Sequence, residues 1–239
     1  MTGGLELTAV LGQARAGNAF EETVERLLTV IKLGMIPAGE RFPAERELAA
    51  QLGISRLTLR EALAELQKAG YVSSRRGRLG GTFVTWTPPA PGREQVQRLA
   101  REDGEKLADA LTFRLAVEAG AAEILAQALG GEQRATLLAR LGDVSAAGPQ
   151  DYRRMDTLFH LAIAELTGSA LLLDACTDAR MRLNGLLNAI PVLQRNIDNT
   201  AGQHAAIVTA ILAGDAQQAR AAVAEHLAGT GALLRGFLS

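Results

Sequence analysis

Residues 42–63 read FPAERELAAQLGISRLTLREAL, and they contain two short helical patterns separated by a tight turn. In the first pattern, Glu45–Leu52, the apolar residues fall on one side of a helix, and Gly53 ends it. Ser55 is a good N-cap for the second helix, Arg56–Ala69. A short helix, a three-residue turn that contains glycine, and a second capped helix together predict a helix-turn-helix.

The flanking sequence extends this motif on both sides. Apolar residues recur every three or four positions in Ala19–Gly34, which predicts an amphipathic helix, and Met35–Phe42 carries the proline and glycine of a turn. After the second helix, Tyr71–Ser74 and Thr82–Thr85 have strand character and enclose a basic, glycine-rich turn. A hairpin in this place is a wing, so we expect a winged helix-turn-helix over residues 19–86.

The remainder of the chain has a different pattern. Three prolines lie in Thr87–Gly92, so we expect residues 87–104 to link two domains. Residues 105–236 show helical periods separated by glycine or proline, without a strand pattern, which predicts an antiparallel bundle of six or seven helices. The expected fold class is therefore mainly α, with an N-terminal winged helix-turn-helix and a C-terminal all-α bundle. Residues 1–18 show no readable role.

The helical periods predicted for the bundle have these bounds: Glu105–Gln127, Gln133–Leu141, Tyr152–Thr167, Leu171–Ala189, Gln203–Ala213 and Ala216–Leu234.

Apolar residues make up 48% of the 239-residue chain, enough for two cores. No apolar stretch is long enough to span a bilayer, and no basic residue precedes the first apolar run, as it would in a secretory signal. With a single cysteine, Cys176, the chain is expected in a reducing cytoplasm, without membrane contact.

The charge is unevenly distributed. The formal net charge is −1, but residues 1–86 hold 11 Lys/Arg against 9 Asp/Glu, and residues 87–239 hold 14 against 17. Within residues 41–86 the count is 8 basic to 4 acidic. A basic module attached to an acidic remainder is compatible with DNA binding by that module alone, although ordinary surface variation produces differences of this size.

Several residues of the basic module have the chemistry of DNA contacts. Arg56 and Arg60 share a helix face away from the apolar stripe, where a guanidinium can pair with guanine or clamp a phosphate. Ser55 and Thr58 lie at the helix N-terminus, where hydroxyl and backbone N–H groups suit phosphate oxygens. Three wing arginines can follow the DNA backbone or enter the minor groove: Arg75, Arg76 and Arg78. Alternatively, the helical arginines are solvated charges paired with the nearby Glu61 or Glu65.

The run as a whole resembles the GntR winged helix. The matching segments are FPAERELA at 42–49, GISR at 53–56, LREAL at 59–63, GYV at 70–72 and GGTFV at 80–84. The resemblance implies that Arg46, Arg56 and Arg60 carry the main operator contacts, with Thr58 and the wing tip at Gly77 assisting. Leu57 departs from the family pattern of a small residue, and an apolar side chain there can touch a thymine methyl.

The three histidines of the chain all fall in the predicted bundle. Asp156 and His160 are four residues apart, so a helix places them on one face. His204 lies ten residues before Gly214 and His226 twelve residues after it, so a chain reversal at this glycine makes the two histidines level. One carboxylate and three imidazoles form a site suited to Zn²⁺ or Ni²⁺, although a single helical histidine is more often a surface or core residue.

Residues 105–235 resemble the FadR-type ligand domain (FCD) of GntR regulators, in its metal-binding branch. The resemblance is carried by FRLAVE at 113–118, by the Asp156–His160 segment, and by the segment from His204 to His226. It implies Asp156, His160, His204 and His226 as ligands of a divalent metal, whose coordination shell a small carboxylate effector completes. Arg114 is a candidate clamp for that carboxylate, or else forms a surface pair with Glu118. Asn184 is a further candidate contact in the effector pocket.

The expected function is that of a DNA-binding transcriptional regulator rather than an enzyme. We expect a homodimer that binds a palindromic operator, as a repressor that leaves the DNA when its effector binds, although the opposite sign of control is open. Three alternatives stay open at this point. They are a metal-dependent hydrolase fused to a winged helix, a regulator whose metal is purely structural, and a DNA-architectural protein without sequence preference.

Overall fold

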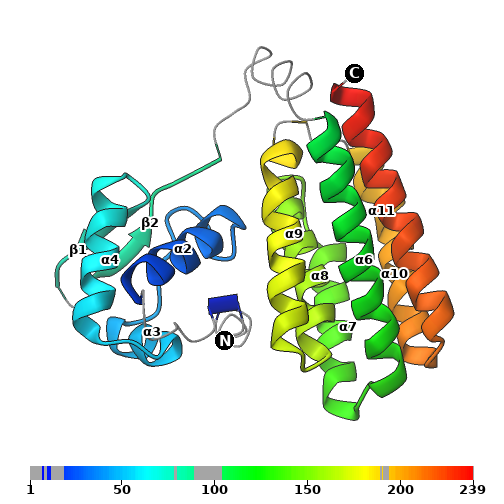
Figure 1. Ribbon diagram of the computed structural model, residues 1–239, viewed down its shortest axis with the longest axis horizontal. Helices are drawn as coiled ribbons and strands as arrows, with labels where there is room; N and C mark the ends of the chain where they lie inside the picture. The colour runs from blue at the N-terminus through cyan, green and yellow to red at the C-terminus, as the bar shows by residue number, and fades with distance from the viewer. Residues whose placement is uncertain are drawn as a thin grey trace. The chain divides into compact units, whose positions relative to one another are not determined.

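The computed structural model of the protein describes residues 7, 10–11, 19–77, 80–88, 104–188, 190 and 194–238. The chain divides into two compact units, Met1–Pro89 and Ala90–Ser239. The first unit holds helices α2, α3 and α4 and a two-stranded sheet, and the second holds helices α6 to α11 (Figure 1). The mainly α fold predicted from the sequence is confirmed. None of the described helices is long and apolar enough to cross a membrane.

The first unit is built on helices α2 (Ala19–Lys32), α3 (Glu45–Leu52) and α4 (Arg56–Lys68). Gly53 ends α3 with a φ of 66°, a left-handed conformation that glycine adopts without steric cost. Ser55 begins α4, and its side chain accepts a hydrogen bond from the backbone N–H of Thr58. The apolar faces of the three helices form the core of the unit: Leu27, Ile31, Leu48, Leu52, Leu59 and Leu66.

The wing is an antiparallel hairpin of β1 (Val72–Arg75) and β2 (Gly81–Val84). Val72 lies opposite Val84, and Arg75 lies opposite Gly81. Both strands lie within one residue of the predicted positions. Of the predicted linker, residues 89–103 lie outside the described residues.

The segment that precedes α3 does more than turn the chain, so the prediction of a simple turn there was incomplete. The backbone N–H of Gly39 donates to Val84 at 2.8 Å, and that of Phe42 donates to Thr82 at 2.9 Å. Residues 39–42 therefore lie along the outer edge of β2 and anchor the wing to the helices. Side-chain periodicity did not reveal this pairing because backbone hydrogen bonds carry it.

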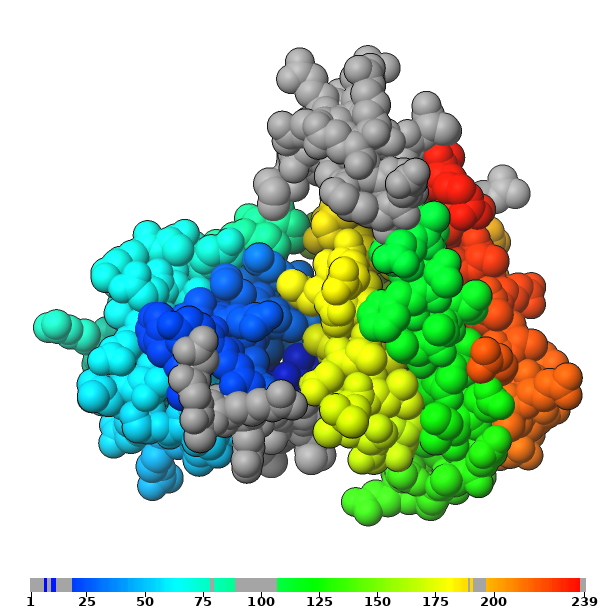
Figure 2. Space-filling model, viewed as in Figure 1, coloured from blue at the N-terminus to red at the C-terminus, as the bar shows by residue number. Residues whose placement is uncertain are grey.

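The second unit consists of antiparallel helices around α6. Helix α6 packs against α8, α9, α10 and α11, which makes it the central helix of the bundle. On the viewed face the side chains of α9 and α6 meet along their lengths (Figure 2). The bounds are α6 (Gly104–Ala128), α7 (Gly131–Ser145), α8 (Tyr152–Leu166), α9 (Ala170–Asn188), α10 (Gln194–Ala213) and α11 (Ala216–Leu238).

Most helices of the bundle begin and end near their predicted bounds, but α10 begins at Gln194 rather than Gln203. Its added first turns are largely polar, so apolar periodicity did not mark them. Gly214 reverses the chain between α10 and α11 with a φ of 73°. The predicted antiparallel hairpin about this glycine is present, since the two helices pack against each other.

Candidate metal centre and nucleic-acid interface

Four side chains from three helices meet inside the second unit. Asp156 and His160 come from α8, His204 from α10 and His226 from α11. One potential ligand atom of each lies within 4.8 Å of all the others. The three histidines are at most 3% exposed. The structure therefore brings together the four residues that the sequence analysis selected as metal ligands.

The outward nitrogens of two of these histidines are held by acceptors. His160 Nδ1 lies 2.9 Å from Glu118 Oε2, and His226 Nδ1 lies 3.0 Å from Gln203 Oε1. Because a carboxylate and an amide oxygen accept hydrogen bonds, both Nδ1 atoms carry the proton in the neutral rings. Both Nε2 atoms then present lone pairs, although they lie only 3.1 Å apart. Two lone pairs at this separation repel each other, and a cation between them removes the repulsion.

The third histidine also presents an unsatisfied nitrogen to the centre. His204 Nε2 is buried and has no hydrogen-bond partner among the described residues, although it lies 3.3 Å from Asp156 Oδ1. A buried polar atom without a partner costs free energy. Ligand atoms bound about 2.1 Å from one ion lie about 3–3.5 Å apart. The separations between His160 Nε2 and His226 Nε2 (3.1 Å) and between His204 Nε2 and Asp156 Oδ1 (3.3 Å) fall in this range, and that between His160 Nε2 and Asp156 Oδ1 is 3.7 Å. Three imidazole nitrogens and a carboxylate thus fit a divalent ion such as Zn²⁺ or Ni²⁺.

A buried ionic network surrounds this centre, and the sequence analysis did not foresee it. Glu118 on α6 accepts hydrogen bonds from Arg114 Nε at 2.9 Å and from Arg180 Nε at 3.0 Å. Arg180, on α9, also donates to Asp156 Oδ2 at 3.1 Å. Arg114, Glu118 and Arg180 are each at most 4% exposed. The network fixes the carboxylate of Asp156 and the ring of His160 through groups on two other helices.

The buried surroundings also keep the two carboxylates ionised and favour the neutral forms of His160 and His226. Burial by itself raises the pKa of Glu118 and of Asp156, but Arg114 and Arg180 beside Glu118, and His160 and Arg180 beside Asp156, hold both pKa values well below their usual range. Burial, together with the charge of Arg180, lowers the pKa of His160 to about 4. Burial and the neighbouring His160 hold the pKa of His226 well below its usual value. Ionised carboxylate and neutral imidazole are the forms that bind metals.

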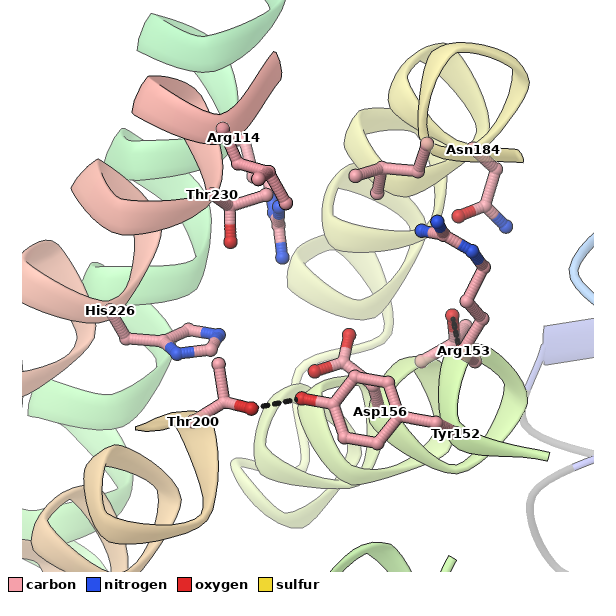
Figure 3. Close-up of a pocket in the computed structure, with 11 residues that line it drawn as sticks. Arg114, Tyr152, Arg153, Asp156, Asn184, Thr200, His226 and Thr230 are labelled. Carbon is pink, nitrogen blue, oxygen red and sulfur yellow. Dashed lines mark hydrogen bonds between the residues drawn. The ribbon is translucent and has the colours of Figure 1, made fainter. Parts of the chain in front are cut away.

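A pocket of about 80 Å³ is lined by two of the four residues, His226 and Asp156, and Figure 3 shows Tyr152 and Thr200 beside them. Arg114 reaches it from α6, and its Nη1 is buried without a hydrogen-bond partner in the described part of the chain. The alternative of a surface Arg114–Glu118 pair was wrong in its location, because the pair exists but is buried. The remaining lining residues are Arg153, Thr157, Asn184, Leu187, Thr230 and Leu233.

In the first unit, the residues predicted to contact DNA lie at the start of α4 and on α3. Ser55 Oγ lies 2.8 Å from Thr58 Oγ1 and caps α4, while Arg46 and Arg56 are exposed. Arg60 Nε donates to Glu45 Oε2 at 2.7 Å. The predicted alternative partners of Arg60, two glutamates on its own helix, were wrong, since its partner comes from α3.

The wing presents a second group of predicted contacts. Arg76 and Gly77 are exposed at its tip, and Gly77 has a φ of 104°, which favours glycine. Arg75 is engaged within the wing, because its guanidinium lies 4.4 Å from the centre of the Phe83 ring. Arg78 lies outside the described residues. Leu57, at 67% exposure, is available to a partner at the start of α4.

Comparisons with known proteins agree with this division into two units. A family model described as "Bacterial regulatory proteins, gntR family" matches residues 20–84, and the FCD domain model matches residues 109–229. The chain is 34% identical over 219 residues to the "Putative L-lactate dehydrogenase operon regulatory protein" of Escherichia coli (strain K12), with 87% of this chain and 83% of that protein covered.

Two further proteins show the same likeness. The "Uxu operon transcriptional regulator" of Escherichia coli (strain K12) is 29% identical over 201 residues, with 79% of this chain and 76% of that protein covered. Among solved structures, E. coli McbR/YncC has a TM-score of 0.50 at 21% identity, with 91% of this chain and 97% of that chain covered. At this identity the structural likeness concerns the fold alone.

Proposed function

The chain belongs to the GntR family of bacterial regulatory proteins, as a DNA-binding transcriptional regulator with an FCD effector-binding domain, and we propose that it is a repressor controlled by a small carboxylate. Its relatives are named as transcriptional regulators, which indicates a regulator without enzymatic activity. We assign residues 19–86 to the DNA-binding domain, 87–104 to the linker and 105–236 to the effector domain.

The observation that carries the proposal is the convergence of lone pairs in the bundle. Asp156, His160, His204 and His226 would hold a divalent ion, zinc or nickel, and the bound ion would supply a Lewis-acidic position for a carboxylate oxygen. The unpartnered Nη1 of Arg114 offers a charge-assisted hydrogen bond to the same carboxylate, and Asn184 offers an amide.

The nature of the relatives agrees with a carboxylate effector. One relative is named for the L-lactate dehydrogenase operon, and L-lactate is a small hydroxycarboxylate. The lining of the pocket is suited to such a molecule, since Tyr152, Thr200 and Thr230 contribute hydroxyl groups beside the basic side chains.

For the DNA-binding domain, we propose that a homodimer places one α4 helix in each half-site of a palindromic operator. Arg46, Arg56 and Arg60 would contact bases or phosphates, and Ser55 and Thr58 would bind phosphate at the start of α4. In the wing, Arg76 and Gly77 would approach the adjacent backbone. The effector controls DNA binding only if it binds the DNA-competent and incompetent arrangements with different affinities.

The test of the metal site is elemental analysis of the purified full-length protein, beside His204→Ala and a matched exchange of an exposed residue, Gln218→Ala. We expect about one divalent ion per chain in the unaltered protein and in the control, and loss of the ion in His204→Ala. No metal in any sample after incubation with zinc or nickel would contradict the proposed site.

The test of control by the effector is operator binding by the metal-loaded protein, measured as fluorescence anisotropy with and without small carboxylates. Release of DNA by a carboxylate that fails to act on His204→Ala supports the proposal. If removal of metal lowers the melting temperature but no carboxylate changes DNA binding, the metal is structural. Equal affinity for operator and scrambled duplexes would instead indicate an architectural protein.

A further inference from the structure

The charges around the pocket do not balance. Among the described residues, the pocket wall and the network directly behind it contain three guanidinium groups and two carboxylates: Arg114, Arg153, Arg180, Asp156 and Glu118. The divalent ion of the proposed function adds two positive charges. A monocarboxylate then leaves a clear excess of positive charge in a partly enclosed site, where charges are poorly screened.

The excess charge is concentrated on Arg153. Arg114 and Arg180 each form an ion pair with Glu118, and Arg180 also pairs with Asp156. No carboxylate oxygen of the described residues lies within 4.0 Å of the Arg153 guanidinium. Arg153 is half-buried, and burial lowers its pKa. The carboxylate of Asp156 acts on the charge of Arg153 only from beyond that distance. A half-buried guanidinium that no carboxylate of the described residues contacts can bind an anion.

The guanidinium of Arg153 is held in place but keeps most of its donors. Its Nη2 donates to the backbone carbonyl of Ile190 at 2.7 Å, which fixes the side chain against the end of α9. Arginine has five N–H donors in a planar fork, so the remaining donors can bind a carboxylate in two-point fashion.

Arg114 and Arg153 line the same pocket from different walls. Arg114 comes from α6 and approaches beside Thr230, whereas Arg153 comes from α8 and lies beside Asn184 in the view of Figure 3. The candidate metal ligands His226 and Asp156 line the pocket as well. A ligand whose single acidic group binds at the metal centre would leave the guanidinium of Arg153 without a bound anion.

We infer that the effector is a dianion, a short dicarboxylate whose first carboxylate binds at the metal centre and Arg114 and whose second binds Arg153. This inference rests on the proposed function and specifies its ligand. The side chains of Tyr152, Thr200 and Thr230 bring hydroxyl groups to the same pocket, so a dicarboxylate with a hydroxyl group fits better than a bare one.

The experiment measures, by calorimetric titration of the zinc-loaded full-length protein, the affinities of two matched pairs of acids. Succinate is compared with butyrate, and malate with 2-hydroxybutyrate, so that each pair differs only in the second carboxylate. We expect the dicarboxylate of each pair to bind roughly ten- to a hundredfold more tightly, the effect of hydrogen bonds to a charged group.

Variants then separate contact with the ligand from a purely structural role. Arg153→Gln is expected to weaken the dicarboxylates by a similar factor and to change the monocarboxylates by less than about twofold. Arg153→Lys should keep a clear part of the preference because it keeps the charge. The control is Arg182→Gln, which removes an exposed arginine of α9 outside the pocket and should leave all four affinities unchanged.

Two results would overturn the inference, and they can be told apart from failure of the proposed function. Equal binding of mono- and dicarboxylates would overturn the dianion but leave a carboxylate effector standing. If Arg153→Gln weakens the binding of monocarboxylates and dicarboxylates equally, Arg153 has a structural role. That result would also reject the dianion but not the proposed carboxylate effector. Absence of binding by all four acids would reject both the inference and the carboxylate effector on which it rests.

Discussion

His160 Nδ1 donates a hydrogen bond to Glu118 Oε2 over 2.9 Å, and both side chains are almost completely buried. The bond joins α8 to the central helix α6 and fixes the proton of the imidazole on the side away from the candidate metal centre. A carboxylate behind a histidine ligand is a common arrangement at metal sites, because it orients the ring and raises its basicity. Glu118 is therefore expected to act on the candidate centre through His160.

The exchange Glu118→Gln is expected to lower the affinity of the protein for zinc about 10- to 100-fold, the effect typical of lost outer-sphere partners. The measurement is a competition titration with a chelator at fixed pH. Glu123→Gln is the matched control, because Glu123 lies on the same helix in an exposed pair with Arg220. An unchanged affinity in Glu118→Gln would show that this hydrogen bond does not tune the centre.

The metal-free protein is expected to lose stability as the pH falls from 7 towards 4. The pKa of His160 is about 4 in the folded protein and about 6.5 in the unfolded chain, so only the unfolded chain gains this proton in the interval. The depressed pKa of His226 acts in the same direction. The carboxylates of Asp156 and Glu118, whose pKa values are also lowered, add to the loss at lower pH.

The check is the free energy of unfolding by urea at several pH values, followed for the transition of the second unit. His160→Gln serves as the comparison, since it lacks the main titrating group and should show a shallower decline between pH 6.5 and 4. A free energy that stays constant over this interval in the unaltered protein would contradict the prediction.

The exposed pair between Glu45 and Arg60 is expected to matter for DNA recognition more than for stability. Exposed ion pairs contribute only about 0–1 kcal/mol. Glu45 holds Nε of Arg60, however, and so leaves both terminal nitrogens free to form a two-point contact with guanine. Arg60→Ala should cost about 1–3 kcal/mol of operator affinity, and Glu45→Gln should cost a smaller amount.

Both variants are measured by titration of operator and scrambled duplexes at one salt concentration, since affinity for DNA depends on salt. The control is Lys68→Ala, which breaks an exposed pair with Glu65 at the far end of the same helix. If Arg60→Ala weakens operator and scrambled DNA equally, Arg60 binds phosphate rather than bases.

Two substitutions at Ser55 are expected to separate helix capping from DNA binding. Ser55→Ala removes the cap of α4 and should cost about 1 kcal/mol of stability. Ser55→Asp keeps a capping acceptor, so its melting temperature should stay near that of the unaltered protein. Its negative charge would face the phosphates, so its affinity for DNA should fall strongly. Normal DNA binding by Ser55→Asp would remove Ser55 from the proposed interface.

The sequence predicted the winged helix closely because local features define it. The glycine at the end of α3, the serine cap of α4 and the apolar stripe of each helix act over a few residues, so they can be read from their spacing. Pairing between residues 39–42 and β2 was missed because it joins backbone groups about forty residues apart, for which side-chain pattern carries no signal.

In the bundle, the sequence by itself determined which residues could form a metal centre, since only three histidines are present and one has an aspartate four residues before it. The tertiary structure decided how the centre is surrounded. Glu118 and Arg180 are 62 residues apart, and only the packing of α6 against α9 makes them partners. That packing buries the network. The i, i+4 pair of Arg114 and Glu118, which would be an ordinary surface pair on an isolated helix, therefore becomes a buried ion pair beside the candidate centre. Helical spacing determines which side chains share a face, whereas burial and long-range pairing depend on which faces meet.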